Sequence, residues 1–293
     1  MRFDAQKQAA PLLVAGCVLF GMGSLIVKFL PLGSYAVAFW RLAVAAVIFW
    51  FLSRFFAQKL PKSRKALWLA LASGGFLGLD LGLWHESVHA VGPGISTLLN
   101  SLQIFFLTAI GFFLFGERLS RVQTAGLLAA VSGVAMIASP EFGHNGDAAW
   151  GFASGIVSGA MLACSMVLVR ETHKVERVPL FPMMLLVSLG GMLFLLLPTF
   201  LFDWGNILPQ TAGQWGMLLV YGAVMQCMAW GMIAYAVPLL SLSVTGLLLL
   251  SEPVAALLID YVFLDKPIDA VQWTGVVLTL AAIYFGSQKS RTH

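Results

Sequence analysis

Residues 238–264 read PLLSLSVTGLLLLSEPVAALLIDYVFL, an apolar stretch long enough to cross a lipid bilayer. Glu252 and Pro253 stand at its middle. A carboxylate at the centre of a membrane costs about 2.5–3.5 kcal/mol on insertion scales. A proline inside a helix leaves one backbone carbonyl without its usual donor. These two residues predict that the stretch lines a path for something polar.

The rest of the chain has the composition of a membrane protein. Of its 293 residues, 59% are hydrophobic and only 10% are charged, and the mean hydropathy is +0.89. Soluble domains of this length do not normally have such values. Cys17, Cys164 and Cys227 all lie in apolar stretches, so neither a disulfide framework nor a zinc ribbon is predicted. The basic residues form no aromatic-interleaved face for a nucleic acid, and no nucleotide-binding loop is present, so we expect no cofactor.

Ten apolar windows of about 20 residues follow one another, each matching the thickness of a bilayer core. They predict an all-α polytopic membrane protein with ten transmembrane helices. The windows fall at residues 12–30, 34–53, 66–84, 93–115, 121–139, 149–170, 179–202, 213–236, 238–264 and 270–287. Nearly all lysines and arginines occupy one alternating set of connections, which the positive-inside rule assigns to the cytoplasm. We expect a multi-pass protein of the cell inner membrane with both termini cytoplasmic.

The two halves of the chain resemble each other. The loop Glu141–Ala148 separates residues 1–143 from residues 144–293, and each part has five predicted helices. When the sequence is aligned with itself at an offset of 149 residues, several identical residues coincide, and Gln103 aligns with Glu252. Because five is an odd number, the second copy enters the membrane from the opposite side, which predicts an inverted repeat. Such repeats are typical of alternating-access transporters, whose binding sites lie near the midplane between the copies.

Polar and aromatic side chains recur on several predicted helices. The helix 93–115 carries Asn100 and Gln103 on one face. The helices 66–84 and 213–236 each carry a polar residue followed, four positions later, by a tryptophan on the same face. An indole beside an acid suits an ammonium or aromatic group through cation–π contact or stacking. The predicted substrate-binding residues are Asp80, Trp84, Asn100, Gln103, Gln226, Trp230 and Glu252.

Each of these residues also has a structural interpretation. Polar side chains can join helices by hydrogen bonds worth about 0.6 kcal/mol each, tryptophans can anchor helix ends, and Asp80 can pair with Arg41. Glu252 itself has two functional interpretations. It could exchange a proton for substrate, which makes it the predicted proton-coupling residue, or it could stay ionised and attract a cation. The sequence does not choose between them.

A different function is suggested by His85-Glu86-Ser87-Val88-His89, which matches the H-E-x-x-H pattern of zinc peptidases. On a helix the two histidines would share a face and bind zinc, with Glu86 as general base. Against this, no third ligand is fixed nearby, and the second copy has no trace of the pattern. An intramembrane zinc metallopeptidase built on His85, Glu86 and His89 is therefore the alternative function. The simpler interpretation is a polar outer loop with no metal site.

Three segments resemble the drug/metabolite transporter superfamily in its EamA-type branch of ten-helix exporters. They are AFWRLAVAAVIF at 38–49, LDLGLWHESVHAVGPGISTLLNSLQIFFLTAIGFFLFGERLS at 79–120 and VPLLSLSVTGLLLLSEPVAALLIDYVFLDKPI at 237–268. The second copy departs from the Gly116-Glu117-Arg118-Leu119 loop of the first, with Leu264-Asp265-Lys266-Pro267 instead. The resemblance implies a central cavity walled by helices 1–4 and 6–9, with helices 5 and 10 behind.

Together these features predict a secondary transporter that is not an enzyme. It would move a small polar or amphipathic organic molecule, such as an amino acid, an amine or a drug-like compound, and the resemblance implies export. The partners that we expect are this small molecule and the lipid bilayer. The sequence leaves open whether two copies pair as a homodimer.

Overall fold

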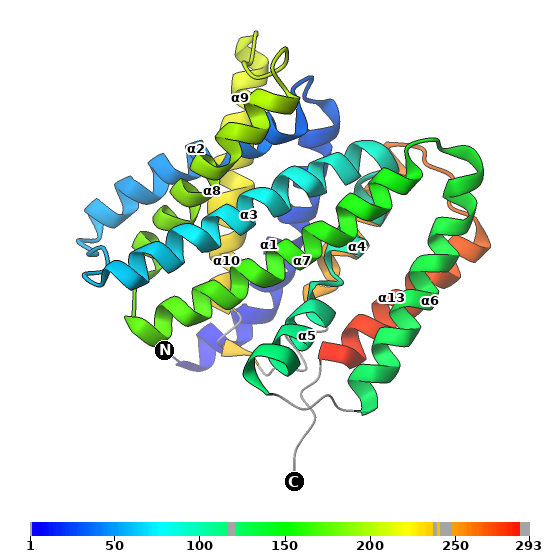
Figure 1. Ribbon diagram of the computed structural model, residues 1–293, viewed down its shortest axis with the longest axis horizontal. Helices are drawn as coiled ribbons and strands as arrows, with labels where there is room; N and C mark the ends of the chain where they lie inside the picture. The colour runs from blue at the N-terminus through cyan, green and yellow to red at the C-terminus, as the bar shows by residue number, and fades with distance from the viewer. Residues whose placement is uncertain (1, 117–120, 237–238, 241–247, 288–293) are drawn as a thin grey trace.

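The structure is a computed structural model whose described part comprises residues 2–116, 121–236, 239–240 and 248–287. The regular elements of this part are helices (Figure 1). In chain order they are α1 (Arg2–Phe29), α2 (Ser34–Phe55), α3 (Arg64–Val91), α4 (Pro93–Asn100), α5 (Gln103–Phe115), α6 (Arg121–His144), α7 (Ala148–Val175), α8 (Leu180–Phe202), α9 (Ala212–Val220), the π-helix η1 (Tyr221–Ala229), α10 (Trp230–Ala236), α12 (Ser251–Phe263) and α13 (Ala270–Ser287).

Eight stretches within the described residues are long and apolar enough to cross a membrane, as expected for an all-α polytopic membrane protein. They are Gln8–Phe29, Ser34–Phe55, Arg64–Val91, Pro93–Phe115, Thr124–Gly143, Ala148–Val175, Leu180–Phe202 and Ala212–Ile233. The predicted helix 270–287 corresponds to α13, which has a shorter apolar part. Residues 241–247 of the predicted helix 238–264 lie outside the described residues. Ten spans and an inverted repeat therefore stay predictions.

Two predicted helices have breaks close to their polar residues. The helix predicted at 93–115 is divided into α4 and α5 by a turn at Ser101 and Leu102. Further along the chain, α12 begins at Ser251, directly after a turn at Leu250. Glu252 and Pro253 thus lie in the first turn of a helix, where a proline removes no helical hydrogen bond. The expectation that Pro253 lies in the interior of a continuous helix is therefore wrong.

The predicted helix 213–236 is continuous but not uniformly α-helical. Between α9 and α10 it passes through η1, in which each N–H bonds to a carbonyl five residues back. Residues five apart are then brought toward the same face of the helix. Tyr221 and Gln226 are such a pair.

Helices α3 and α8 pack with their backbones nearly in contact. A Cβ atom added at Gly74 would overlap the carbonyl oxygen of Val187, and one at Gly190 would overlap that of Leu71. Gly74 and Gly78, one turn apart on α3, therefore allow α3 and α8 to approach each other closely. Because glycine has no side chain, the two backbones can lie close enough for van der Waals contact along their length.

Helices α6 and α13 form a pair of their own beside the main bundle, at the right of Figure 1. Their contact also uses glycines, because a Cβ atom added at Gly133 would lie 2.7 Å from the carbonyl oxygen of Gly275. This position agrees with the resemblance, which implies that the fifth and tenth helices stand behind the cavity walls.

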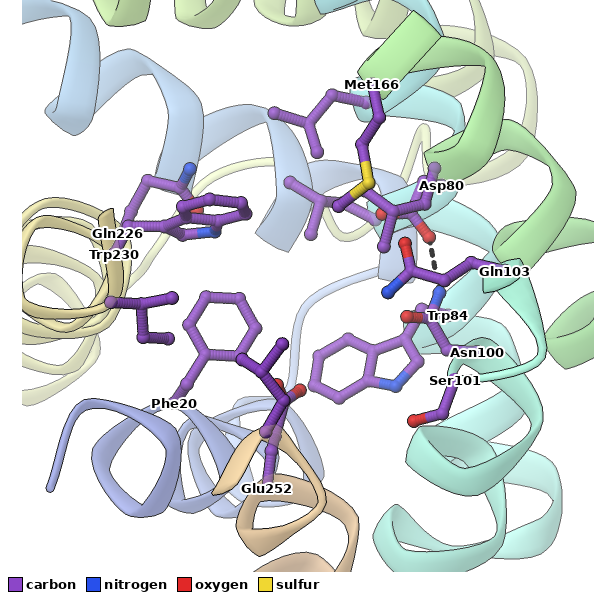
Figure 2. A pocket seen from close by; sticks show the side chains of 15 residues that line it. Phe20, Asp80, Trp84, Asn100, Ser101, Gln103, Met166, Gln226, Trp230 and Glu252 are labelled. Carbon is purple, nitrogen blue, oxygen red and sulfur yellow. Dashed lines mark hydrogen bonds between the residues drawn. The ribbon is translucent and has the colours of Figure 1, made fainter. Parts of the chain in front are cut away.

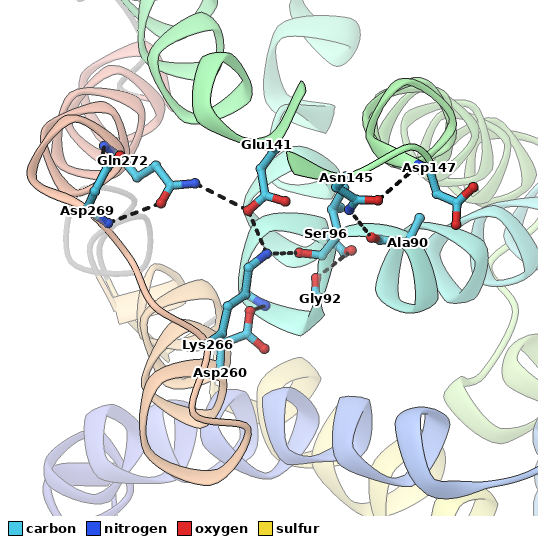
Figure 3. Close-up of polar contacts among 12 residues, drawn as sticks. Ala90, Gly92, Ser96, Glu141, Asn145, Asp147, Asp260, Lys266, Asp269 and Gln272 are labelled. Atoms are coloured by element: carbon cyan, nitrogen blue, oxygen red, sulfur yellow. Dashed lines mark hydrogen bonds and ion pairs between the residues drawn. The ribbon is translucent and has the colours of Figure 1, made fainter. Parts of the chain in front are cut away.

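A polar cluster joins the ends of four helices on one side of the bundle (Figure 3). The Lys266 ammonium lies 2.9 Å from Glu141 Oε1 at the end of α6, and Gln272 of α13 donates to the same oxygen at 3.2 Å. Asp260, near the end of α12, accepts a hydrogen bond of 2.8 Å from the backbone N–H of Gly94 at the start of α4. These contacts connect both halves of the chain at this end.

The α3–α8 contact predicts a specific sensitivity to side-chain size. Gly74→Ala should destabilise the protein by about 1–3 kcal/mol, the usual cost of overpacking, because its Cβ atom meets backbone that cannot move aside. Gly216→Ala in α9 is the matched control, since nothing lies within 4 Å of its added Cβ atom. Thermal unfolding in detergent should show a lower midpoint for Gly74→Ala alone. Equal midpoints for the two variants would contradict the packing described.

Candidate functional site

A cavity of about 300 Å³ lies between the helices of the two halves (Figure 2). All seven residues that the sequence predicts for substrate binding line it. Its wall consists of Phe20, Leu77, Asp80, Leu81, Trp84, Asn100, Ser101, Gln103, Leu162, Met166, Gln226, Trp230, Ile233, Leu249 and Glu252. Their role in binding stays a prediction, but the structure brings them to one place from α3, α4, α5, η1, α10 and α12.

On the side of the first half, Asp80 is the acidic group. Its carboxylate is buried and accepts a hydrogen bond of 2.7 Å from the amide nitrogen of Asn100 (Figure 2). The same nitrogen donates to the hydroxyl of Ser158 at 2.9 Å. Among the described residues Asp80 has no ion-pair partner. The expected pairing with Arg41 is therefore wrong, for a reason that the contacts of Arg41 make clear.

Arg41 on α2 is almost completely buried, and its guanidinium is directed at η1 instead. Its Nε donates to Gln226 Oε1 at 2.6 Å, and its Nη1 donates to the Tyr221 hydroxyl at 2.7 Å. The guanidinium also lies over two aromatic rings, 4.9 Å from the centroid of Phe20 and 4.5 Å from that of Tyr221. Gln226 and Tyr221 reach the same cation because they are five residues apart in a π-helix.

The bond from Arg41 determines which end of Gln226 is available to the cavity. A guanidinium has only donors, so it holds the carbonyl end of the amide. The amide nitrogen, which can only donate, is the end of Gln226 that Arg41 does not hold. Gln226 itself lines the cavity. Sequence reasoning placed Gln226 at the site but missed Arg41 and Tyr221 as the residues that orient it.

His85 extends this hydrogen-bond network into α3. Its Nδ1 lies 2.9 Å from the carbonyl oxygen of Ser34, which can only accept, so Nδ1 donates. Its Nε2 lies 2.8 Å from the hydroxyl of Tyr221, which already accepts from Arg41 and can donate its own proton to the ring. The network joins α2, α3 and η1 through residues that are all buried.

Glu252 is the acidic group on the side of the second half. Figure 2 shows its side chain directed from α12 toward the cavity. Among the described residues its carboxylate makes no hydrogen bond and no ion pair. Gln103, which the 149-residue shift superposes on it, stands at the first position of α5, and its buried Oε1 atom has no hydrogen-bond partner in the described part of the chain.

Aromatic rings form much of the remaining wall. Trp84 and Trp230 belong to the predicted set, and Phe20 of α1 stands edge-on to Trp230 with ring centroids 6.3 Å apart. The sequence reasoning did not predict Phe20, because a single phenylalanine in an apolar helix has no distinguishing pattern. Two carboxylates, amide groups and three aromatic rings thus face one space, and no lysine or arginine among the described residues lines it.

The H-E-x-x-H residues do not form a metal site in the described part of the chain, where no group of three His, Cys, Asp or Glu is arranged to hold an ion. Both nitrogens of His85 have partners, whereas His89 is exposed and Glu86 accepts a bond of 3.0 Å from the indole of Trp150. The interpretation as a polar outer loop is also wrong for His85. Since α3 continues to Val91, the residue is inside a helix and inside the bundle.

Comparison with known families agrees with the resemblance seen in the sequence. The model of the EamA-like transporter family matches the chain twice, at residues 7–139 and 149–287. The chain belongs to this family. It is therefore a member of the drug/metabolite transporter superfamily, and its multi-pass membrane location follows from the family and the apolar helices.

Two curated relatives are similar to this EamA-like transporter over about two thirds of its length. A chloroplastic WAT1-related protein of Arabidopsis thaliana is 22% identical over 210 residues, which are 69% of this chain and 50% of that protein. A probable amino-acid metabolite efflux pump of Salmonella typhimurium is 26% identical over 214 residues, 68% of this chain and 70% of that protein. The chain thus spans about half the length of the plant relative.

The fold also resembles that of a protein solved by crystallography. The two structures superpose with a TM-score of 0.62 at 15% sequence identity, over 96% of this EamA-like chain and 97% of the other. At this identity the similarity concerns the fold alone.

The contacts of the two histidines predict that they are not equivalent. His85→Ala should destabilise the protein by about 1–3 kcal/mol for each buried partner left unpaired. His89→Ala, at an exposed position, should change stability by less than about 0.5 kcal/mol. Thermal unfolding and zinc analysis of the purified variants measure both effects. If the wild type contained one zinc ion per chain, and if either substitution removed this zinc, the result would instead favour the metallopeptidase.

Proposed function

We propose that this EamA-like transporter is a secondary exporter of a small amphipathic or polar organic molecule that carries a positive charge. The proposal rests on two carboxylates that face one cavity, Asp80 from the first half and Glu252 from the second. Aromatic rings line this cavity, and no basic side chain of the described residues does. Arg41 lies directly behind Gln226 and Phe20 of this wall, so its charge offsets part of the negative charge of the two acids. Two acids against one base still leave a net negative charge, which attracts a cation, and the rings stabilise the cation by cation–π contact. The efflux-pump relative supports the direction of transport.

The amide groups refine the expected substrate. Arg41 holds Gln226 so that its amide nitrogen can donate, which suits an acceptor oxygen on the substrate. The apolar wall, with Leu77, Ile233 and Met166, suits a hydrocarbon or aromatic body. A molecule with an ammonium group, an apolar or aromatic body and an acceptor oxygen would use all three parts of the cavity. Amino acids, amines and drug-like cations all satisfy this description.

The proposed mechanism is alternating access by two inverted five-helix repeats, residues 1–143 and 144–293, that rock about the cavity. The breaks before α5 and α12 support it. They occur at positions related by the 149-residue shift, and interrupted helices at matching positions of two halves commonly mark a transporter's binding site. Each break allows its half-helix to move without bending a continuous helix.

Proton exchange at Glu252 would supply the driving force. In one state the carboxylate binds the substrate cation; once the cavity opens to the other side, a proton from water replaces the cation and the substrate leaves. The unpaired carboxylate facing the cavity supports this role, because a group held by a permanent ion pair would not be available to both ligands in turn. Asp80, held by Asn100, would help to bind the substrate throughout.

Replacement of Glu252 tests the proposal directly. A thermal-shift screen of amino acids, nucleosides, quaternary amines and vitamins first identifies a ligand, and uptake into proteoliposomes under a pH gradient then measures transport. Glu252→Gln should bind this ligand at least about tenfold more weakly, since a charge-assisted contact contributes about 1.5–3 kcal/mol. It should also lose the response to the pH gradient.

Glu86→Gln serves as the control, because Glu86 lies on α3 outside the cavity and should leave transport unchanged. If Glu252→Gln transported the ligand with wild-type pH dependence, proton exchange at Glu252 would be excluded. If the strongest ligands were anions, the proposed substrate class would be wrong.

A further inference from the structure

A second charged region lies at the ends of α2, α3, α7 and α8, and none of its residues lines the cavity. Exposed basic side chains gather in the α2–α3 and α7–α8 connections, which we call the basic surface. It consists of Arg54, Lys59, Lys62, Arg64, Lys65, Lys174 and Arg177. The first connection belongs to the first half of the chain and the second to the other half.

Direct contacts hold the two connections together. Both oxygens of Glu176 accept backbone hydrogen bonds, from Lys62 N at 3.0 Å and from Ser63 N at 2.8 Å. Gln58 Oε1 accepts from the backbone N–H of Phe181 at 3.1 Å, and the rings of Phe56 and Phe181 lie 5.3 Å apart. The basic residues of the two loops therefore share one fixed surface (Figure 1, left).

The acidic residues of this region are already occupied. Glu176 is engaged by the backbone at the start of α3, and these N–H donors hold the pKa of its carboxyl below the ordinary value of 4.5. Glu171 pairs with Lys174 at 2.7 Å. Within the described residues, the other six members of the basic surface form no ion pair, although the charge of Lys62 contributes to the lowered pKa of Glu176. The surface thus has a strong uncompensated positive charge.

Exposed apolar side chains lie beside these charges in the sequence and on the same helix ends. Phe55 is 82% exposed, Trp68 is 68% exposed and Leu60 is 51% exposed. Aromatic residues at helix ends typically lie at the level of lipid headgroups. In a bilayer this arrangement would place the positive charges near the depth of the phospholipid phosphates, with the aromatic rings next to the acyl chains.

We propose that the basic surface is a binding site for anionic phospholipid. The headgroup phosphate would contact the basic residues near the start of α3, and the acyl chains would pack against the exposed aromatic side chains. Because the surface combines both halves of the chain, a bound lipid would bridge them. The charge complementarity does not depend on which side of the membrane this end faces or on what the cavity transports.

Native mass spectrometry of the detergent-purified full chain tests the site, with phosphatidylglycerol and phosphatidylcholine as probes. The wild type should retain phosphatidylglycerol in preference to phosphatidylcholine. This preference should largely disappear at about 1 M salt, where the screening length is only about 3 Å. Lys62→Gln with Lys65→Gln should weaken phosphatidylglycerol binding by about thirtyfold, which corresponds to about 1 kcal/mol for each of the two basic residues removed.

The control is Lys28→Gln with Arg121→Gln, which removes the same charge from exposed positions outside the basic surface. It should bind phosphatidylglycerol as the wild type does. Equal binding of the two lipids by the wild type would overturn the proposal, and so would equal losses in the two double variants. The comparison of lipids in the wild type decides the matter even if the Lys62, Lys65 variant does not fold.

Discussion

A carboxylate inside a bilayer must be satisfied by the protein, by water or by a ligand, because lipid tails offer no hydrogen bonds. In this chain the two carboxylates of the cavity differ in their hydrogen-bond partners. Asp80 has Asn100, while Glu252 has no partner among the described residues and faces an open space. The surrounding helices leave a cavity at that place, and the acid that has no protein partner there is the basis of the proposed cationic substrate.

Breaks in the helices allow the polar groups to reach the cavity. α5 begins at Gln103 and α12 begins at Ser251, so the two residues that the repeat relates, Gln103 and Glu252, both stand in first turns. The π-helical segment η1 has a comparable effect, because its wider turn aligns Tyr221 and Gln226 with Arg41. Regular α-helices through these positions would direct the same side chains differently.

The sequence predicts the apolar helices and the cavity residues because both can be recognised from the order of the amino acids alone. A span of about 20 apolar residues has few alternatives to a membrane helix, and an acid within such a span is unusual enough to be noticed, as with Glu252. Spacing of four places Asp80 with Trp84 and Gln226 with Trp230 on shared faces, and the structure brings all four to the same cavity. The membership of the EamA-like family confirms the resemblance that the segments around them suggested.

The contacts between helices could not be predicted in the same way. Arg41 was expected to pair with Asp80 because opposite charges attract, but the π-helix offers it two nearer acceptors, and no sequence pattern signals a π-helix. His85 resembles a zinc ligand in sequence, whereas its two ring nitrogens are used by Ser34 and Tyr221 from other helices. Such pairings depend on the distance between helices, which periodicity does not encode.

The most direct test of the central claim, that the cavity between the halves receives a cationic substrate, is a cryo-electron microscopy structure with benzyltrimethylammonium or with the strongest cation from the ligand screen. We expect ligand density in the cavity, with the positive group within about 4–6 Å of the carboxylate of Asp80 or Glu252 and against the rings of Trp84, Trp230 or Phe20. Density at another place on the protein, with the cavity empty at saturating ligand, would contradict the account.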